Sequence, residues 1–289
     1  MTYNLRKPYI FLVCILSFFS CKKKVDLPQS FERIYKLHNI YTLTPSGATL
    51  YYDFVYTGAT LTSLLVTNTN TGEQFFRHEF IYNSDKLVRV ETYRTTPSTS
   101  TPERRLMLFY TGGMVTKIER HNSSNGNFFL SAFVTYTYSN GKMTRKICSN
   151  QQSWGEQIIC RADYSYDASG NINTAALEYP LGGPVTVRIT PSYTNIENTL
   201  LVTNPPLAAI IWDLTNPNFF TTGFDEILLF SKNYVNGFKR DINGWVSDFN
   251  FTMEFDSNKM PRRIFNYPDL FTNSSDPVFH DMKIAYILK

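Results

Sequence analysis

Cysteines are the residues of this chain most open to covalent chemistry, and Cys21 is the first that matters. It follows a basic pair, Arg6 and Lys7, and an apolar run of eleven residues, Tyr9–Phe19. This pattern is typical of a bacterial lipoprotein signal, although Phe18 stands where the common pattern has Leu. The run is shorter than the about 20 apolar residues that a helix needs to span a bilayer. The expected chemistry is therefore cleavage before Cys21 and acylation of its side chain.

The signal also predicts where the chain is held. Residues 1–20 would be removed and residues 21–34 would form a lipidated tether, which leaves 35–289 as a single β-repeat domain. A lipid on Cys21 anchors the protein in the cell envelope, and we expect the membrane to be the outer membrane. The sequence leaves open whether the domain faces the periplasm or the cell surface.

Cys148 and Cys160 are the two other cysteines of the mature chain. They flank Ser149–Ile159, a polar stretch that predicts a long hairpin loop, so the two sulfurs would face each other across paired strands. An oxidising envelope permits a disulfide there, worth about 3 kcal/mol for a loop of this size. Two reduced core thiols are the alternative. Because soft ligands are few, we expect no metal site.

Acids and histidines offer little for catalysis. Glu254 and Asp256 share strand parity and face one side, where a pair of acids could hydrolyse glycosides or simply form a solvated rim. His78 and Glu79 are adjacent and face opposite sides, so they cannot act as a pair. Residues 167–173 carry oxygen ligands at alternate positions, but their glycine is misplaced for a calcium loop. Motifs for nucleotide binding or serine hydrolysis are absent, and we predict no catalytic residue and no cofactor.

Trp154 and Trp245 give the best indication of binding. Trp154 lies in the predicted loop beside Gln151 and Gln152, and Trp245 follows the turn dipeptide Asn243-Gly244. An exposed indole can stack on a sugar ring or dock a partner, while amides supply hydrogen bonds. Alternatively, each ring folds back over the edge of the sheet.

The composition excludes one class of partner. Loss of the signal removes only Arg6 and Lys7, so the 28 Lys plus Arg and 24 Asp plus Glu of the whole chain come close to balance. A balanced chain without long blocks of one charge does not favour nucleic acid. Aromatic residues make up 16% of the chain, which is enough for a large core.

A repeat decides the architecture. Four tyrosines recur at intervals of 28 residues and a fifth precedes them by 26, at Tyr56, Tyr82, Tyr110, Tyr138 and Tyr166. Each ends an aromatic-rich segment, a turn sequence such as Ser139-Asn140-Gly141 follows, and a second alternating segment begins, as in Met114-Thr116-Ile118 and Met143-Arg145-Ile147. We expect the tyrosines in the core. Such hairpins predict an all-β fold, a large curved antiparallel meander or barrel-like sheet.

The repeat is interrupted before a final hairpin at residues 251–264. Residues 204–235 contain chain-breaking sequences and then apolar residues at helix-like spacing, which predicts a short helical or loop insertion. We expect it to cover the open end or face of the sheet rather than to gate a ligand.

The hairpin unit, the insertion with Leu228–Asn233 and the closing Phe251–Pro261 stretch together resemble lipoproteins of Bacteroidota that form a family of unknown function with a porin-like fold. The resemblance covers most of residues 35–289 and implies fold and location, but no catalytic residue. The hairpins are also distantly similar to YD repeats, which build the β-shell around secreted toxins, although this chain lacks their long uninterrupted arrays.

Three classes of function follow from these observations. The sequence fits best an envelope lipoprotein that binds or scaffolds a glycan, a peptide or an outer-membrane partner without catalysis. A carrier of a hydrophobic ligand would need small apolar residues inside the curve of the sheet. A glycan-active hydrolase would need acids that converge in one cleft.

Overall fold

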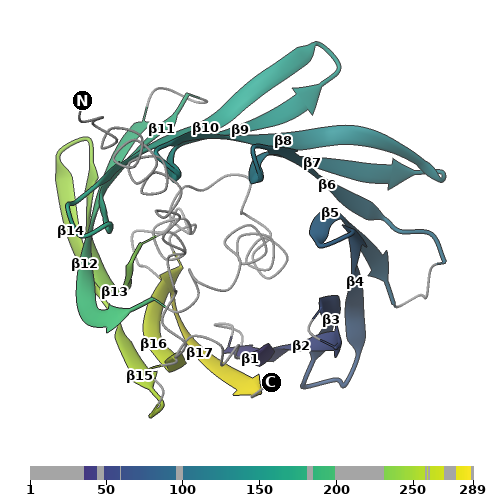
Figure 1. Ribbon diagram of the computed structural model, residues 1–289, viewed down its shortest axis with the longest axis horizontal. Helices are drawn as coiled ribbons and strands as arrows, with labels where there is room; N and C mark the ends of the chain where they lie inside the picture. The colour runs from purple at the N-terminus through teal and green to yellow at the C-terminus, as the bar shows by residue number, and fades with distance from the viewer. Residues whose placement is uncertain are drawn as a thin grey trace, which may run out of the picture. The chain divides into compact units, whose positions relative to one another are not determined.

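The computed structural model consists of β-strands joined by turns and loops wherever it is described (Figure 1). It describes residues 36–43, 49–58, 60–95, 100–180, 185–198, 231–257, 259, 261–269 and 278–287. The strands are β1 (Lys36–Leu43), β2 (Thr49–Thr57), β3 (Thr60–Asn68), β4 (Gln74–Asn83), β5 (Lys86–Arg94), β6 (Arg104–Thr111), β7 (Met114–Ser124), β8 (Asn127–Ser139), β9 (Lys142–Gln152), β10 (Gly155–Tyr166), β11 (Ile172–Tyr179), β12 (Val185–Glu197), β13 (Asn233–Ile242), β14 (Trp245–Asn250), β15 (Thr252–Phe255), β16 (Pro261–Asp269) and β17 (Val278–Ile287).

The all-β prediction is confirmed. The predicted insertion over residues 204–235 lies almost wholly outside the described residues, and its last three residues already belong to β13. No helix in the described part of the chain has the length and hydropathy needed to cross a membrane. Every described strand belongs to one compact unit, residues 36–287.

Hydrogen bonds join the seventeen strands into one antiparallel sheet. Each strand from β1 to β13 pairs with the next, and β15 pairs with β16 and β16 with β17. The last strand, β17, lies beside the first, β1. Only Phe251 separates β14 from β15, and this one extended segment pairs first with β13 and then with β16. The strand order therefore returns to its starting point.

Turn chemistry explains the hairpins. At the β8–β9 turn Asn140 and Gly141 both have positive φ, 51° and 75°, and at the β13–β14 turn Asn243 and Gly244 have φ of 51° and 91°. Two central residues with positive φ make the two-residue turn whose twist matches that of antiparallel strands, and Asn-Gly adopts it at little cost.

Each repeat tyrosine sits beside a β-bulge, which corrects the face prediction for the strand that follows. Thr137 pairs with Arg145 but Tyr138 pairs with Met143, so Thr144 is an extra residue. Its hydroxyl donates to the Thr137 carbonyl (3.3 Å). The same shift occurs at the other repeat positions, at Tyr56, Tyr82, Tyr110 and Tyr166. Strict alternation after the turn is therefore wrong, because a bulge moves every later side chain to the opposite face.

The repeat tyrosines tie neighbouring hairpins together. Tyr138 donates its hydroxyl to the Val115 carbonyl (2.8 Å), and Val115 is the residue paired with the tyrosine of the preceding hairpin, Tyr110. Equivalent bonds join Tyr110 to Leu87, Tyr166 to Met143 and Tyr193 to Ile172. Tyr110, Tyr138 and Tyr166 pack against the core, as expected, and so does Tyr193, which lies outside the predicted repeat. Burial raises the pKa of Tyr110, Tyr166 and Tyr193.

The two faces of the sheet differ in chemistry. The face that carries the buried hydrophobic cluster, which we call the core face, includes Leu64, Val90, Leu106, Ile118 and Val134. The opposite face, which we call the charged face, holds ion pairs, including Arg105–Glu91 (2.8 Å), Arg89–Glu91 (3.2 Å), Lys117–Glu119 (2.7 Å), Arg145–Asp163 (2.6 Å) and Arg161–Glu178 (3.3 Å). Most apolar and charged residues therefore lie on opposite sides of the same strands, although the fully buried Lys146 lies on the core face.

Candidate functional site

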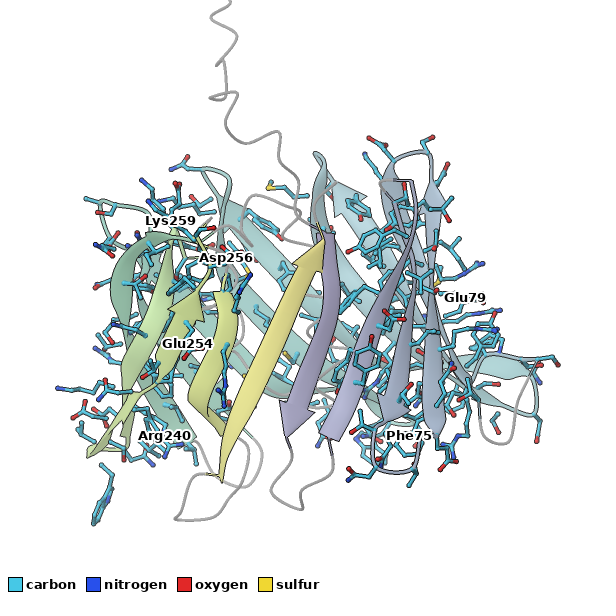
Figure 2. All side chains as sticks on the ribbon, turned by 90° about the horizontal axis from the view of Figure 1, so that it is seen from below. Phe75, Glu79, Arg240, Glu254, Asp256 and Lys259 are labelled. Atoms are coloured by element: carbon cyan, nitrogen blue, oxygen red, sulfur yellow. The ribbon has the colours of Figure 1, made fainter. Side chains whose placement is uncertain are left out.

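Among the described residues, five of the seven exposed large apolar side chains lie at one end of the sheet, which we call the aromatic end, and the other two, Val55 and Phe109, lie toward the opposite end. The members of the aromatic end and their exposed fractions are Phe129 (51%), Trp154 (77%), Val185 (36%), Trp245 (84%) and Val246 (55%). They lie near the ends of paired strands, at the ends where β7 is followed by β8, β9 by β10, β11 by β12 and β13 by β14. Because strand direction alternates in a meander, every second turn is at the same end of the sheet. In Figure 2, Phe75 and Arg240 lie toward this end, and Asp256 and Lys259 lie toward the opposite one.

Trp154 sits at the tip of a tight turn, not in a long loop. The predicted loop over residues 149–159 is wrong, because β9 extends to Gln152 and β10 begins at Gly155. Polar residues remain in the strands because they bond to each other across the pair, as Ser149 does to Glu156 (2.7 Å between Oγ and Oε1). The indole is exposed, so it does not fold back over the sheet.

The amides beside Trp154 belong to strand β9. Gln151 and Gln152 are both half-buried, and the Gln151 side-chain amide donates to the Gln152 carbonyl (3.3 Å). They lie close to the indole in sequence, but that bond occupies one of the Gln151 donors. Their predicted role in ligand binding stays a prediction.

Trp245 is the first residue of β14 and pairs with Ile242 across the turn. The turn is fixed by Asp241, whose carboxylate accepts a hydrogen bond from the Gly244 N–H (2.8 Å). The indole is exposed here too and does not cover the sheet. Four strand positions separate this hairpin from that of Trp154, which at about 4.8 Å per strand places them about 20 Å apart along the sheet. One small ligand cannot bridge both indoles, whereas an extended partner can.

Cys148 and Cys160 face each other on the core face. They are register partners on β9 and β10, both are fully buried, and both are thiols. Directly opposed residues of an antiparallel pair have Cα atoms about 4.5–5.5 Å apart, which is within the range that a disulfide spans. The geometry therefore suits the bridge, and its formation stays a prediction.

His78 is a buried polar residue on the core face, 3% exposed. Its Nδ1 lies 3.0 Å from Thr92 Oγ1, and Nε2 has no hydrogen-bond partner in the described part of the protein. Burial, and then the charge of Arg104, lowers the pKa of His78 to about 3. Glu79 lies on the charged face beside Arg77 (3.1 Å), so the expectation that the two adjacent residues face opposite sides is confirmed.

Comparison with solved structures identifies the architecture. A porin-like protein from Bacteroides vulgatus superposes with a TM-score of 0.51 at 9% identity, over 88% of this chain and 99% of that one. A porin-like protein from Bacteroides uniformis gives 0.51 at 11% identity, over 87% and 96%. This chain has a porin-like fold. No protein family model and no curated protein matches the sequence.

A third solved structure is similar only over part of its length. The TcdB2-TccC3-Cdc42 complex gives a TM-score of 0.33 at 14% identity, over 86% of this chain and 14% of that one. That score is too low to support an argument. At these identities the likeness to the Bacteroides proteins shows the porin-like fold alone.

The acids and the turn considered from sequence are not assembled into a site on this porin-like fold. Glu254 is exposed on β15, and Asp256 follows the strand, where its carbonyl accepts from the Lys259 N–H (3.0 Å). Asp167 caps its own turn by accepting from the Asn171 N–H (2.9 Å). Among the described residues no group of three or more His, Cys, Asp and Glu could hold a metal ion.

Sequence reasoning found the two tryptophans but not their neighbours. Phe129, Val185 and Val246 each lie within a few residues of a turn, and these turns alternate along the chain with those of the opposite end. Counting turns by parity would have grouped them with Trp154 and Trp245. The signal was therefore present in the hairpin order rather than in any local motif.

Proposed function

We propose that this chain is a non-catalytic binding module of the cell envelope, anchored by lipid on Cys21, that engages its partner through the aromatic end. The observation that carries the proposal is the collection of exposed apolar side chains on four consecutive hairpins of that end. Exposed apolar residues are common singly, but five of the seven large ones among the described residues lie at this end, which favours it as an interaction surface.

The charged face supports attachment by lipid rather than by the sheet. Strands that face lipid present a continuous apolar band to it. Here the residues of the charged face form ion pairs, such as Arg145 with Asp163, and the apolar residues that alternate with them are buried on the core face. We therefore assign membrane contact to the acylated Cys21.

The place where the lipid-bearing segment joins the sheet supports binding at the aromatic end. The segment that carries Cys21 joins the sheet at Lys36, the first residue of β1. Strand alternation puts Lys36 at the end opposite to the aromatic end. The covalent link to residues 1–35 is therefore at the end opposite to the indoles, which suits a partner that meets the aromatic end.

The core face favours this function over the hydrophobic carrier. A carrier would need small apolar residues there, but large side chains occupy many of its positions, among them Tyr52, Phe54, Phe80 and Phe238. The fully buried Lys146 also shares that face.

Site-specific photo-crosslinking in the native host tests the proposal. A benzophenone amino acid would replace Trp154 or Trp245, and Asp85, an exposed turn residue of the opposite end without positive φ, would serve as the matched control. We expect crosslinked species at both aromatic-end positions and none at position 85. Equal crosslinking at all three, or none at the aromatic end, would refute the binding end. Separately, Cys21→Ala should release the chain from the membrane fraction.

A further inference from the structure

Among the described residues, one side of β14 has no paired strand. β14 pairs with β13 from Trp245 to Asn250, and the described pairings place no strand along its other side. The extended segment gains β16 as a neighbour only after Phe251. Five of the six β14 residues are exposed, on both faces of the strand, as expected for a strand with a single neighbour.

The β13–β14 turn determines which backbone groups are free on this edge. A two-residue turn makes Ile242 and Trp245 the closing hydrogen-bonded pair of the hairpin. Hydrogen bonding alternates along an antiparallel strand, so every second residue from Trp245 bonds to β13. The N–H and C=O groups of the intervening residues point to the open side, at Val246, Asp248 and Asn250. They repeat at about 6.8 Å, which is two residues of strand.

The side chains along this edge also lack partners. Val246 is exposed beside the exposed Trp245. Asp248 is exposed, and its carboxylate makes no ion pair among the described residues, although Lys239 is its register partner on β13. The edge therefore offers an apolar position, then a negative charge, along a row of free donors and acceptors.

We propose that β14 accepts an extended peptide segment of the partner, which adds to the sheet as an antiparallel strand along Val246–Asn250. This inference names the class of partner for the aromatic end, and so it rests on the proposed function. A row of alternating N–H and C=O groups at strand spacing is complementary to another peptide backbone, which a sugar or a lipid does not reproduce. Cross-strand pairing selects an apolar peptide residue opposite Val246 and a Lys or Arg opposite Asp248.

Peptide selection on the full chain tests the proposal. Short linear peptides displayed on phage would be selected against the protein, and enriched sequences would be synthesised and titrated. Asp248→Pro removes an N–H from the open side while leaving the bonds to β13 intact, and Pro is tolerated at a sheet edge. Asp248→Ala is the matched control, because it keeps the N–H. We expect Asp248→Pro to weaken binding about tenfold or more and Asp248→Ala to weaken it much less.

Amide exchange on the unmodified protein covers the case in which Asp248→Pro does not fold. Without peptide, the amides of Val246, Asp248 and Asn250 should exchange much faster than those of Ser247 and Phe249, and peptide should protect them. Failure to enrich any peptide, or equal binding to the Pro variant, would overturn the edge proposal. If crosslinks at positions 154 and 245 then prove to be glycan, the aromatic end still binds but the edge does not. If those crosslinks are missing altogether, the proposed function fails as well.

Discussion

The buried His78 makes the stability of this protein depend on pH in a way that one substitution isolates. Its pKa is about 3 in the folded chain against an ordinary value of 6.5, because burial and the nearby Arg104 disfavour the charged ring. Between these values the unfolded chain binds a proton that the folded chain does not. Protonation therefore favours unfolding, and the free energy of unfolding falls as the pH drops below about 6.5.

The slope of this loss is set by one proton. It is about 1.4 kcal/mol for each pH unit, so the free energy of unfolding falls by about 2 kcal/mol between pH 6.5 and pH 5 because of His78. That is a substantial part of the 5–15 kcal/mol typical of a folded domain. Its full contribution is present above pH 6.5 and is lost progressively as the pH approaches 3.

Urea unfolding at several pH values between 7.5 and 5 measures this slope. His78→Gln stays neutral throughout, so it should unfold with a shallower pH dependence than the unmodified protein, whatever its absolute stability. His121→Gln is the matched control, because His121 is on the charged face beside Glu119 (2.9 Å between Nε2 and Oε2) and is partly exposed. It should keep most of the slope. Identical slopes for the His78 variant and the unmodified protein would refute the reasoning.

Three further predictions concern the sheet. Tyr138→Phe removes the hydrogen bond to the Val115 carbonyl and leaves that acceptor unsatisfied, so urea unfolding should show a loss of about 1 kcal/mol. Gly237→Ala would place a Cβ 2.6 Å from a backbone oxygen of β14 and should cost about 2 kcal/mol or more, measured as a lower Tm; an unchanged Tm would contradict the packing. Under oxidising conditions Cys148 and Cys160 should form a disulfide that lowers the mass by two hydrogens, and mass spectrometry of the reduced and oxidised protein detects it, with an unchanged mass counting against the bridge.

Local patterns predicted the hairpins because each depends only on neighbouring residues. Asn140-Gly141 specifies its turn by its own backbone preferences, and the tyrosine before it stands near the end of an aromatic-rich strand. The return of β17 to β1 was beyond such reasoning, because it joins segments more than 200 residues apart in sequence. The change of partner at Phe251, which leaves one side of β14 without a paired strand among the described residues, could not be predicted for the same reason.

The polar strands around Trp154 were missed because composition is a weak guide to strands whose polar groups satisfy one another. Ser149 and Glu156 sit on neighbouring strands and bond through their side chains, so neither needs a loop to reach water. A rule that equates polar stretches with loops fails wherever such cross-strand pairs exist. The two indoles were identified because turn dipeptides flank them, which is a local signal.

The bulges decide which side chains of each repeat lie on the core face and which lie on the charged face. Simple alternation from Met143 would place Arg145 on the core face and Lys146 on the charged face. The extra Thr144 reverses this, so Arg145 reaches the Asp163 carboxylate at 2.6 Å and Lys146 is buried. A one-residue slip flips every later side chain, so the bulge must recur wherever the repeat does. The bulge recurs beside each repeat tyrosine. In three of the hairpins the tyrosine hydroxyl also donates a hydrogen bond to the preceding hairpin. The spacing of the tyrosines and the assignment of side chains to the two faces therefore depend on the same repeated unit.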